Sequence, residues 1–249
     1  LIQADPLTQI PPILMNKEGE RKNFYIVDFE PDLIRSAMEK ICIKFGIFIQ
    51  ISRVCKYVVQ VRAKTGEFGN LNGFLKEIAI KFDNLVIFDA NLAQFLVNKL
   101  RQLDMRVTFA ESCTGGLAAA RLCEISGASD VFSGSFITYA NELKTQILGV
   151  REEILREFGA VSRECVSQML SGAIRASGSD FAVAFSGIAG PGGGSDEKPV
   201  GTVYIGAMDS AGNCIIERFL LSGDRNYIRE TSVNIGYALL LKLRVDLFF

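Results

Sequence analysis

The chain has 249 residues, of which 49% are hydrophobic and 22% charged, and its formal net charge is −1. This composition excludes an intrinsically disordered or fibrous protein, and the charge leaves no global field that would draw the chain onto nucleic acid or anionic lipid. The sequence contains no histidine. Because imidazole is the commonest general base and transition-metal ligand near neutral pH, a Ser-His-Asp triad, a zincin site and a facial-triad iron site are excluded.

No two cysteines stand at the spacing of a zinc knuckle or a redox motif, so we expect reduced, mostly buried thiols. The six are Cys42, Cys55, Cys113, Cys123, Cys165 and Cys214. No apolar run approaches the roughly 18 residues of a membrane span, and the first residues lack the pattern of a signal peptide. We therefore expect a cytoplasmic protein.

The first third of the chain predicts an arm followed by a small domain. Residues 1–22 hold three of the six prolines and a charged cluster, which indicates a poorly ordered or extended arm. Residues 23–88 then read as β-α-β-β-α-β, the split β-α-β order of ferredoxin-like α+β domains. The expected strands are 24–29, 47–54, 57–63 and 85–88, and the expected helices are 31–45, which opens with a proline, and 71–82.

Residues 89–249 alternate helices and strands and predict a three-layer α/β domain with a mixed sheet. The expected helices are 90–104, 117–125, 141–149, 152–159, 163–176 and one from about residue 224. The expected strands are 106–110, 135–140, 180–187, 200–208 and 213–221.

The segment VTFAESCTGGLAAARL, residues 107–122, reads as strand, tight turn and helix, with Ser112 and Cys113 on the turn. A helix start presents unpaired N–H groups that can stabilise an oxyanion or hold a phosphate, and a hydroxyl there can be a nucleophile. A plain N-cap formed by Ser112 or Thr114 is the competing interpretation.

Without histidine, the base for a serine nucleophile must be a lysine, a carboxylate or a tyrosine. Tyr139 and Lys144 lie five residues apart where a strand end meets a helix start. If Asn141 caps that helix, Lys144 lies in its first turn, where the helix dipole and partial burial both lower an ammonium pKa. The competing interpretation makes Lys144 a solvated surface lysine and Tyr139 a core aromatic.

The loop SGIAGPGGGSDEKPVG, residues 186–201, contains six glycines and follows an apolar strand, so it should lie at the sheet edge where ligands collect in α/β folds. It matches neither a P-loop nor a dinucleotide fingerprint. Arg225 and Arg229, at i and i+4 near the start of the last helix, could hold a phosphate. A mobile hairpin and a solvated helix face are the alternatives.

These stretches together resemble one family. ESCTGG (111–116), TYANELK (138–144), GAVS (159–162), SGIAGPGGGSDEKPVGTVYIG (186–206) and SGDR (222–225) are similar to the CinA C-terminal domain, or nicotinamide mononucleotide deamidase. The resemblance runs in one order from about Asn91 to the end. It implies an amidohydrolase of pyridine nucleotide salvage that uses no metal and no cofactor.

The resemblance also implies roles for individual residues. The family's catalytic serine falls on Ser112, its lysine on Lys144 and its tyrosine on Tyr139. We expect the oxyanion to be held by backbone amides, and the ribose and phosphate to be enclosed by the glycine loop and the last helix. The expected amides are those of Cys113, Thr114 and Gly115, and the expected substrate contacts are Gly187, Ala189, Gly190, Gly192 and Arg225.

Other functions stay open at this point. A nucleotide-binding or assembly module of a competence/damage-inducible protein is the alternative to an enzyme. Residues 24–88 resemble the linking domain of multidomain CinA proteins in size and element order, and their GEFG (66–69) matches the GxxG of KH domains. The middle pair of GEFG is not basic, so we expect a packing or dimerisation domain, a homodimer, and neither nucleic acid nor a membrane as partner.

Overall fold

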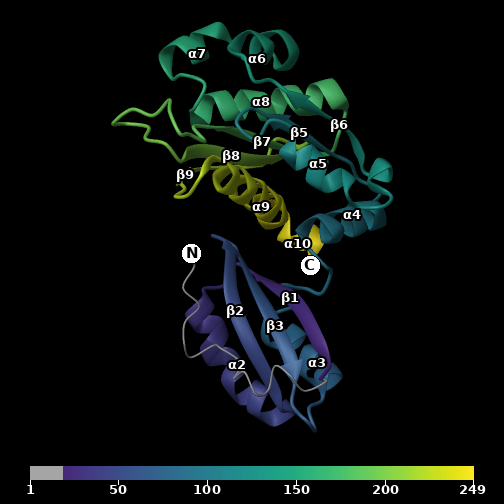
Figure 1. Cartoon of the computed structure of the whole chain (residues 1–249). Coiled ribbons are helices and arrows are strands. Elements are labelled where there is room, and N and C mark those ends of the chain that lie inside the picture. Colours follow the sequence, from purple (N-terminus) through teal and green to yellow (C-terminus); the bar gives the residue numbers. More distant parts are fainter. Residues whose placement is uncertain (1–18) are drawn as a thin grey trace. The chain divides into compact units, whose positions relative to one another are not determined.

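The computed structural model describes residues 19–249, which divide into two compact units between Ala90 and Asn91 (Figure 1). Each unit has its own sheet and its own core. Most of the arm expected over residues 1–22 lies outside the described residues. Its last two residues, Arg21 and Lys22, already belong to the first strand.

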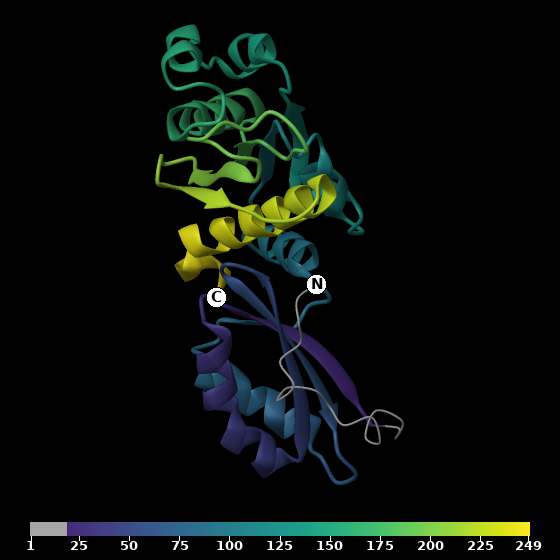
Figure 2. The same cartoon turned by 60° about the vertical axis from the view of Figure 1, so that its left-hand side comes forward.

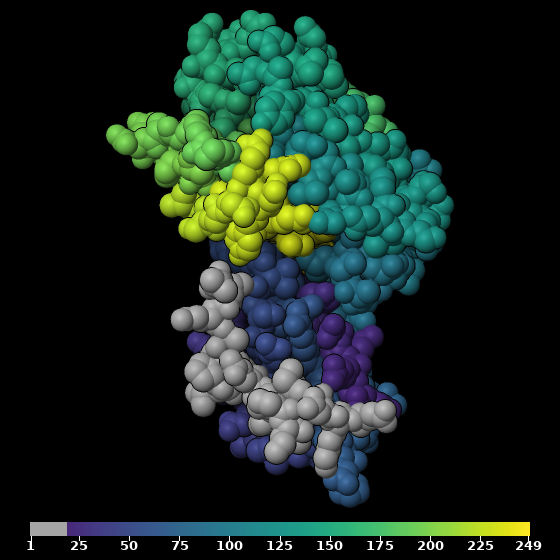
Figure 3. Space-filling view, in the orientation of Figure 1, coloured from purple at the N-terminus to yellow at the C-terminus, as the bar shows by residue number. Residues whose placement is uncertain are grey.

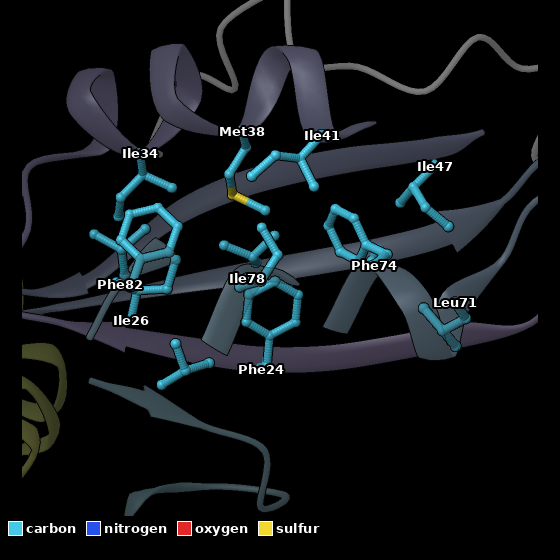
Figure 4. Packing of buried hydrophobic residues seen from close by; sticks show 14 residues of the cluster. Phe24, Ile26, Ile34, Met38, Ile41, Ile47, Leu71, Phe74, Ile78 and Phe82 are labelled. Atoms are coloured by element: carbon cyan, nitrogen blue, oxygen red, sulfur yellow. The ribbon is translucent and has the colours of Figure 1, made fainter. Parts of the chain in front are cut away.

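The smaller unit has a four-stranded antiparallel sheet in the order β2-β3-β1-β4, with two helices on one face (Figures 1 and 4). This strand order is the one that a split β-α-β unit produces, so the expected ferredoxin-like fold is confirmed. The elements are β1 (Arg21–Val27), α2 (Pro31–Phe45), β2 (Ile47–Cys55), β3 (Val58–Thr65), α3 (Leu71–Lys81) and β4 (Val86–Ile87).

Helix α2 shows how local sequence builds this unit. Pro31 is its first residue, where a missing N–H costs nothing, and Gly46 ends it in the left-handed conformation at φ 60°. Its apolar stripe packs onto the sheet and onto α3, as the close view of the core shows (Figure 4). Strand β1 was expected to reach residue 29 but ends at Val27, because Asp28 has a φ of 64° that no strand accommodates.

The larger unit is built on a five-stranded sheet in the order β6-β5-β7-β8-β9. Strands β6, β5 and β7 are parallel, whereas β8 and β9 are antiparallel additions. The strands are β5 (Val107–Glu111), β6 (Phe132–Ile137), β7 (Phe181–Gly187), β8 (Thr202–Asp209) and β9 (Cys214–Leu220). The mixed sheet is therefore confirmed.

Helices cover both faces of this sheet. Helix α8 packs on one face and α9 on the other, with α4 and α5 beside α9 and with α6 and α7 beside α8 (Figures 1 and 2). The expected three-layer arrangement is therefore confirmed. The helices are α4 (Leu92–Leu103), α5 (Leu117–Cys123), α6 (Asn141–Leu148), α7 (Glu152–Glu157), α8 (Arg163–Ser177), α9 (Arg225–Leu243) and α10 (Val245–Phe248), with a 3-10 turn η2 (Ala128–Asp130).

The three parallel strands end at one edge of the sheet. Glu111, the last residue of β5, lies between Ile137 of β6 and Phe185 of β7. The segments that follow these strands therefore meet at this edge. Strand β6 begins at Phe132 rather than at residue 135, because Phe132 pairs with Val107 despite the intervening Ser-Gly.

All six cysteines lie within the described residues and are free thiols. The expectation that most are buried is wrong for Cys123 and Cys214, which are exposed, while Cys42 is half-buried. Among residues 19–249, no helix has both the length and the apolar character needed to cross a bilayer.

Candidate active site

Ser112 lies on the turn that leaves the carboxyl end of β5. Its N–H donates to the carbonyl of Phe185 in the neighbouring β7 at 3.0 Å, which fixes the turn against the sheet. The side chain is partly exposed. Ser112 is therefore held rigidly while its hydroxyl stays within reach of a ligand.

Lys144 approaches Ser112 from helix α6 and is buried, with 1% of its surface exposed. Its Nζ lies 3.3 Å from Ser112 Oγ, 2.8 Å from the Thr138 carbonyl oxygen and 3.1 Å from the Tyr139 carbonyl oxygen. The interpretation of Lys144 as a solvated surface lysine is therefore wrong. The helix is not capped by Asn141, since its N-cap is Ala140 and Asn141 is already helical.

The pKa of Lys144 is lowered from the ordinary value of 10.5, chiefly because burial penalises the ammonium form. The contacts also fit a neutral amine. Its two hydrogens would bind the two carbonyl oxygens, which leaves the nitrogen lone pair to accept the Ser112 hydroxyl proton. This geometry suits the roles expected for the two residues, with Ser112 as nucleophile and Lys144 as its base.

Cys113 is the competing nucleophile on the same turn. It is 5% exposed, and burial is the largest of the effects that raise the pKa of its thiol to about 12. A thiol with that pKa is almost fully protonated near neutral pH and reacts poorly. The site therefore favours Ser112 over Cys113.

The side chain of Tyr139 is exposed and contacts Arg225. Its ring is 58% exposed, so the interpretation as a core aromatic is wrong. Its hydroxyl accepts a hydrogen bond from the Arg225 guanidinium at 3.1 Å, and Arg225 also donates to the carbonyl of Gly190 at 2.7 Å. Tyr139 thus holds Lys144 through its carbonyl oxygen, while its phenol joins Arg225 and the glycine loop.

The start of helix α5 is not organised as expected from sequence. Its N-cap is Gly116, at φ 91°, so the N-cap interpretation of Ser112 and Thr114 is wrong. The first amides of the helix donate to the buried carboxylate of Glu111. These amides therefore already have an acceptor and are not free to bind an anionic ligand.

Two further expected contacts are already engaged inside the protein. The Gly115 N–H donates to the Ser112 carbonyl at 3.1 Å and is therefore not free to bind an oxyanion. Of the three expected oxyanion donors, the amides of Cys113 and Thr114 are left. Arg229 donates to the Thr114 carbonyl, at 2.6 Å from its terminal nitrogen. Arg229 therefore braces the turn, and Arg225 is the arginine placed beside the glycine loop.

The glycine loop extends from the end of β7 to the start of β8, as the light-green segment projecting from the larger unit (Figures 1 and 3). Ala189 and Gly190 are buried at its base, whereas Gly192 is exposed. A side chain at Gly190 would meet Val200 at 2.6 Å, so the base of the loop admits only glycine there. A Cβ at Gly187, the last residue of β7, would lie 2.8 Å from the Thr202 carbonyl oxygen.

Three fully buried threonines at the same edge of the sheet leave their hydroxyls without a hydrogen-bond partner in the described part of the chain, namely Thr114, Thr138 and Thr202. Unpaired buried polar groups are rare in folded proteins. These hydroxyls could bond a water or a bound ligand.

The match to known proteins covers this whole arrangement. Residues 89–244 match the family described as the CinA C-terminal domain. The chain belongs to the CinA family. A CinA-like protein of Dictyoglomus turgidum is 41% identical over 181 residues, which are 71% of this chain and 44% of that protein. A CinA-like protein of Akkermansia muciniphila is 48% identical over 141 residues, which are 57% of this chain and 34% of that protein.

A solved structure is similar to a large part of this chain. The competence/damage inducible protein CihA from Agrobacterium tumefaciens aligns with a TM-score of 0.61 and 44% identity. The alignment covers 61% of this chain and 93% of that one. This chain spans less than half the length of the curated CinA-like proteins named above.

Two features of this CinA domain were not anticipated. The GAVS stretch joins α8 to the start of the glycine loop. Ser162 caps α8, and the Ala160 carbonyl oxygen accepts a hydrogen bond from the Ser186 hydroxyl at 2.7 Å. Glu111 was also missed. A signal for it was available in the sequence. Glu111 is an acidic residue at the end of an apolar strand, and it stands five positions before Gly116, which has no side chain to cap the helix that follows.

Proposed function

We propose that this chain hydrolyses the carboxamide of nicotinamide mononucleotide to nicotinate mononucleotide and ammonia. The observation that carries the proposal is the contact of the buried Lys144 Nζ with Ser112 Oγ at 3.3 Å. The choice of substrate rests on the resemblance of the surrounding motifs to nicotinamide mononucleotide deamidases. The reaction would serve pyridine nucleotide salvage in the cytoplasm.

In the first step, neutral Lys144 takes the hydroxyl proton of Ser112, and Oγ attacks the carboxamide carbon. The backbone amides of Cys113 and Thr114 are the proposed donors to the oxyanion, because neither makes a main-chain hydrogen bond within residues 19–249. Lys144 then returns the proton to the departing nitrogen, which leaves as ammonia and gives an acyl-enzyme.

In the second step, water attacks the ester that joins Ser112 to the nicotinoyl group. Lys144 accepts a proton from that water and returns it to Ser112 Oγ, so the enzyme is regenerated and nicotinate mononucleotide is released. The sum of both steps consumes one amide and one water, and Lys144 ends in its starting protonation state.

Recognition of the nucleotide is assigned to the side of the site that carries Arg225. Its guanidinium is exposed, yet two hydrogen bonds hold it between Tyr139 and the glycine loop. Such a fixed cation is suited to a phosphate monoester. The loop residues Gly187, Ala189, Gly190 and Gly192 are the proposed wall of the ribose and phosphate pocket.

The test is incubation of the chain with nicotinamide mononucleotide, with ammonia and nicotinate mononucleotide measured in equal amounts over time. Lys144→Met should release neither product. Lys99→Met removes a lysine from the larger unit at a position on α4 that packs over Phe95, and it should keep full activity. Binding of the nucleotide without either product in the wild type would instead favour a non-catalytic module.

A further inference from the structure

Glu111 is a buried acid that the proposed reaction does not use. It is the last residue of β5 and has no exposed surface. A carboxylate in the interior is unfavourable unless it is well hydrogen-bonded. Its presence directly before Ser112 therefore calls for an explanation.

Four hydrogen bonds converge on this carboxylate. The amides of Gly116, Ala118 and Ala119 donate to it at 2.9, 3.1 and 3.0 Å. The Ser135 hydroxyl lies 3.2 Å from the carboxylate and equally far from the Phe109 carbonyl oxygen, so its single proton is shared between these two acceptors. Three donors come from the first turn of α5, where the positive end of the helix dipole also attracts an anion. The fourth comes from β6.

The bonds bracket the turn that carries Ser112. The turn begins at the backbone of Glu111 and returns to its side chain at Gly116, so one residue holds both ends of the loop. Gly116 supplies no capping side chain, and its φ of 91° is the conformation that lets the chain reverse here. Without the carboxylate, the amides of Gly116, Ala118 and Ala119 would lose their acceptor, and that of Ala118 lies in the interior.

Glu111 is also connected to the base. Its carbonyl oxygen accepts the Thr138 N–H at 2.9 Å, and the Thr138 carbonyl accepts Lys144 Nζ at 2.8 Å. The Glu111 side chain also contacts Ser135 in β6, three residues before Thr138. The segment bearing Lys144 and the turn bearing Ser112 are thus both tied to a single residue.

We infer that Glu111 is a positioning residue that sets the alignment of Ser112 with Lys144. It does so through hydrogen bonds to the start of α5 and to the end of β6. The inference rests on the proposed function, because it assigns the alignment to a reacting pair. In this inference the N-terminus of α5 binds the Glu111 carboxylate and not a group of the substrate. The phosphate of the substrate then depends on Arg225, not on this helix.

The variant that tests the inference is Glu111→Gln, which keeps the shape but replaces one acceptor oxygen by an amide nitrogen that faces N–H donors. A displacement of the nucleophile by about 1 Å costs on the order of 100-fold in rate, so we expect a fall of that order in kcat with KM changed less than about 3-fold. Glu124→Gln removes an exposed glutamate that pairs with Arg121 at the far end of α5, and it should leave both constants unchanged.

Labelling of Ser112 by a fluorophosphonate, followed by intact mass, supplies a readout that does not need the nucleotide. We expect Glu111→Gln to label on the order of 100-fold more slowly than the wild type at equal folded fraction, as judged by circular dichroism. Equal labelling and equal kcat with only a lower melting temperature would show a merely structural role and overturn the inference.

A second variant and the results for the wild type distinguish failure of this inference from failure of the proposed function. If Glu111→Gln does not fold, Ser135→Ala removes a single donor, and it should slow labelling by about 3- to 10-fold, while an unchanged rate would count against the inference. Labelled wild type that releases no ammonia from nicotinamide mononucleotide overturns the proposed substrate alone. Wild type that is neither labelled nor active overturns both.

Discussion

Lys144 Nζ and Ser112 Oγ lie 3.3 Å apart although the two residues are separated by 32 positions in the chain. Their contact forms because β5 and β6 are parallel neighbours that end at the same edge of the sheet. Burial of the lysine lowers its pKa, so the same geometry that brings the pair together prepares the lysine as a base.

Ser112→Ala should abolish ammonia release and leave the fold intact. Within residues 19–249 its hydroxyl has one hydrogen bond, to Lys144, and such a loss costs about 1 kcal/mol, or about 2–4 °C in a domain of this size. Ammonia assays and a thermal melt measure both effects. Cys113→Ala should stay active because the buried thiol is protonated, and the opposite pattern would make Cys113 the nucleophile.

The rate should rise with pH and reach a plateau. Only unprotonated Lys144 can accept the Ser112 proton, and its lowered pKa moves the rise in kcat/KM below the ordinary lysine value of 10.5. A profile of kcat/KM measured between roughly pH 6 and 10 should show a single ionisation. A rate that falls over this range would contradict a lysine base.

Lys144→Arg should be inactive even though it keeps the positive charge. A guanidinium does not release its proton at working pH, so it cannot accept the proton of the Ser112 hydroxyl. Activity and melting temperature are the measurements, and a well-folded, inactive variant is the expected result. An active arginine variant would reduce Lys144 to an electrostatic role.

Tyr139→Phe should act on substrate binding more than on chemistry. The variant keeps the carbonyl that holds Lys144 and loses the phenol that orients Arg225. One neutral or charge-assisted hydrogen bond corresponds to about a 3- to 10-fold rise in KM, with kcat changed less than about 3-fold. A large fall in kcat at constant KM would instead assign the phenol to proton relay.

A fragment of residues 91–249 should hydrolyse nicotinamide mononucleotide within a few-fold of the full chain. All site residues lie in the larger unit, which has its own sheet and core. Residues 19–90 alone should show no turnover. A folded but inactive larger unit would show that the small unit contributes to the site or orders it through an oligomer interface.

The sequence by itself determined the elements that depend on local signals. Helix α2 has the predicted bounds because Pro31 starts it, a glycine follows its last residue, and its apolar positions recur at helical spacing. Alternating apolar strands and helices after residue 89 likewise predicted the α/β layers. The missing histidines limited the chemistry, and the family's motifs supplied the candidate pair Ser112 and Lys144.

Only the tertiary structure decided how these residues are used. The local sequence left a cap by Ser112 or Thr114 as an alternative. The N-cap of α5 is Gly116, and the Glu111 side chain accepts the amide hydrogen bonds there because the turn folds back on β5. The phenol of Tyr139 turns to Arg225, which is 86 positions away in sequence. Local patterns fix which backbone conformations are favourable, whereas the partner of a buried side chain is fixed by the strand order and packing that bring distant segments together.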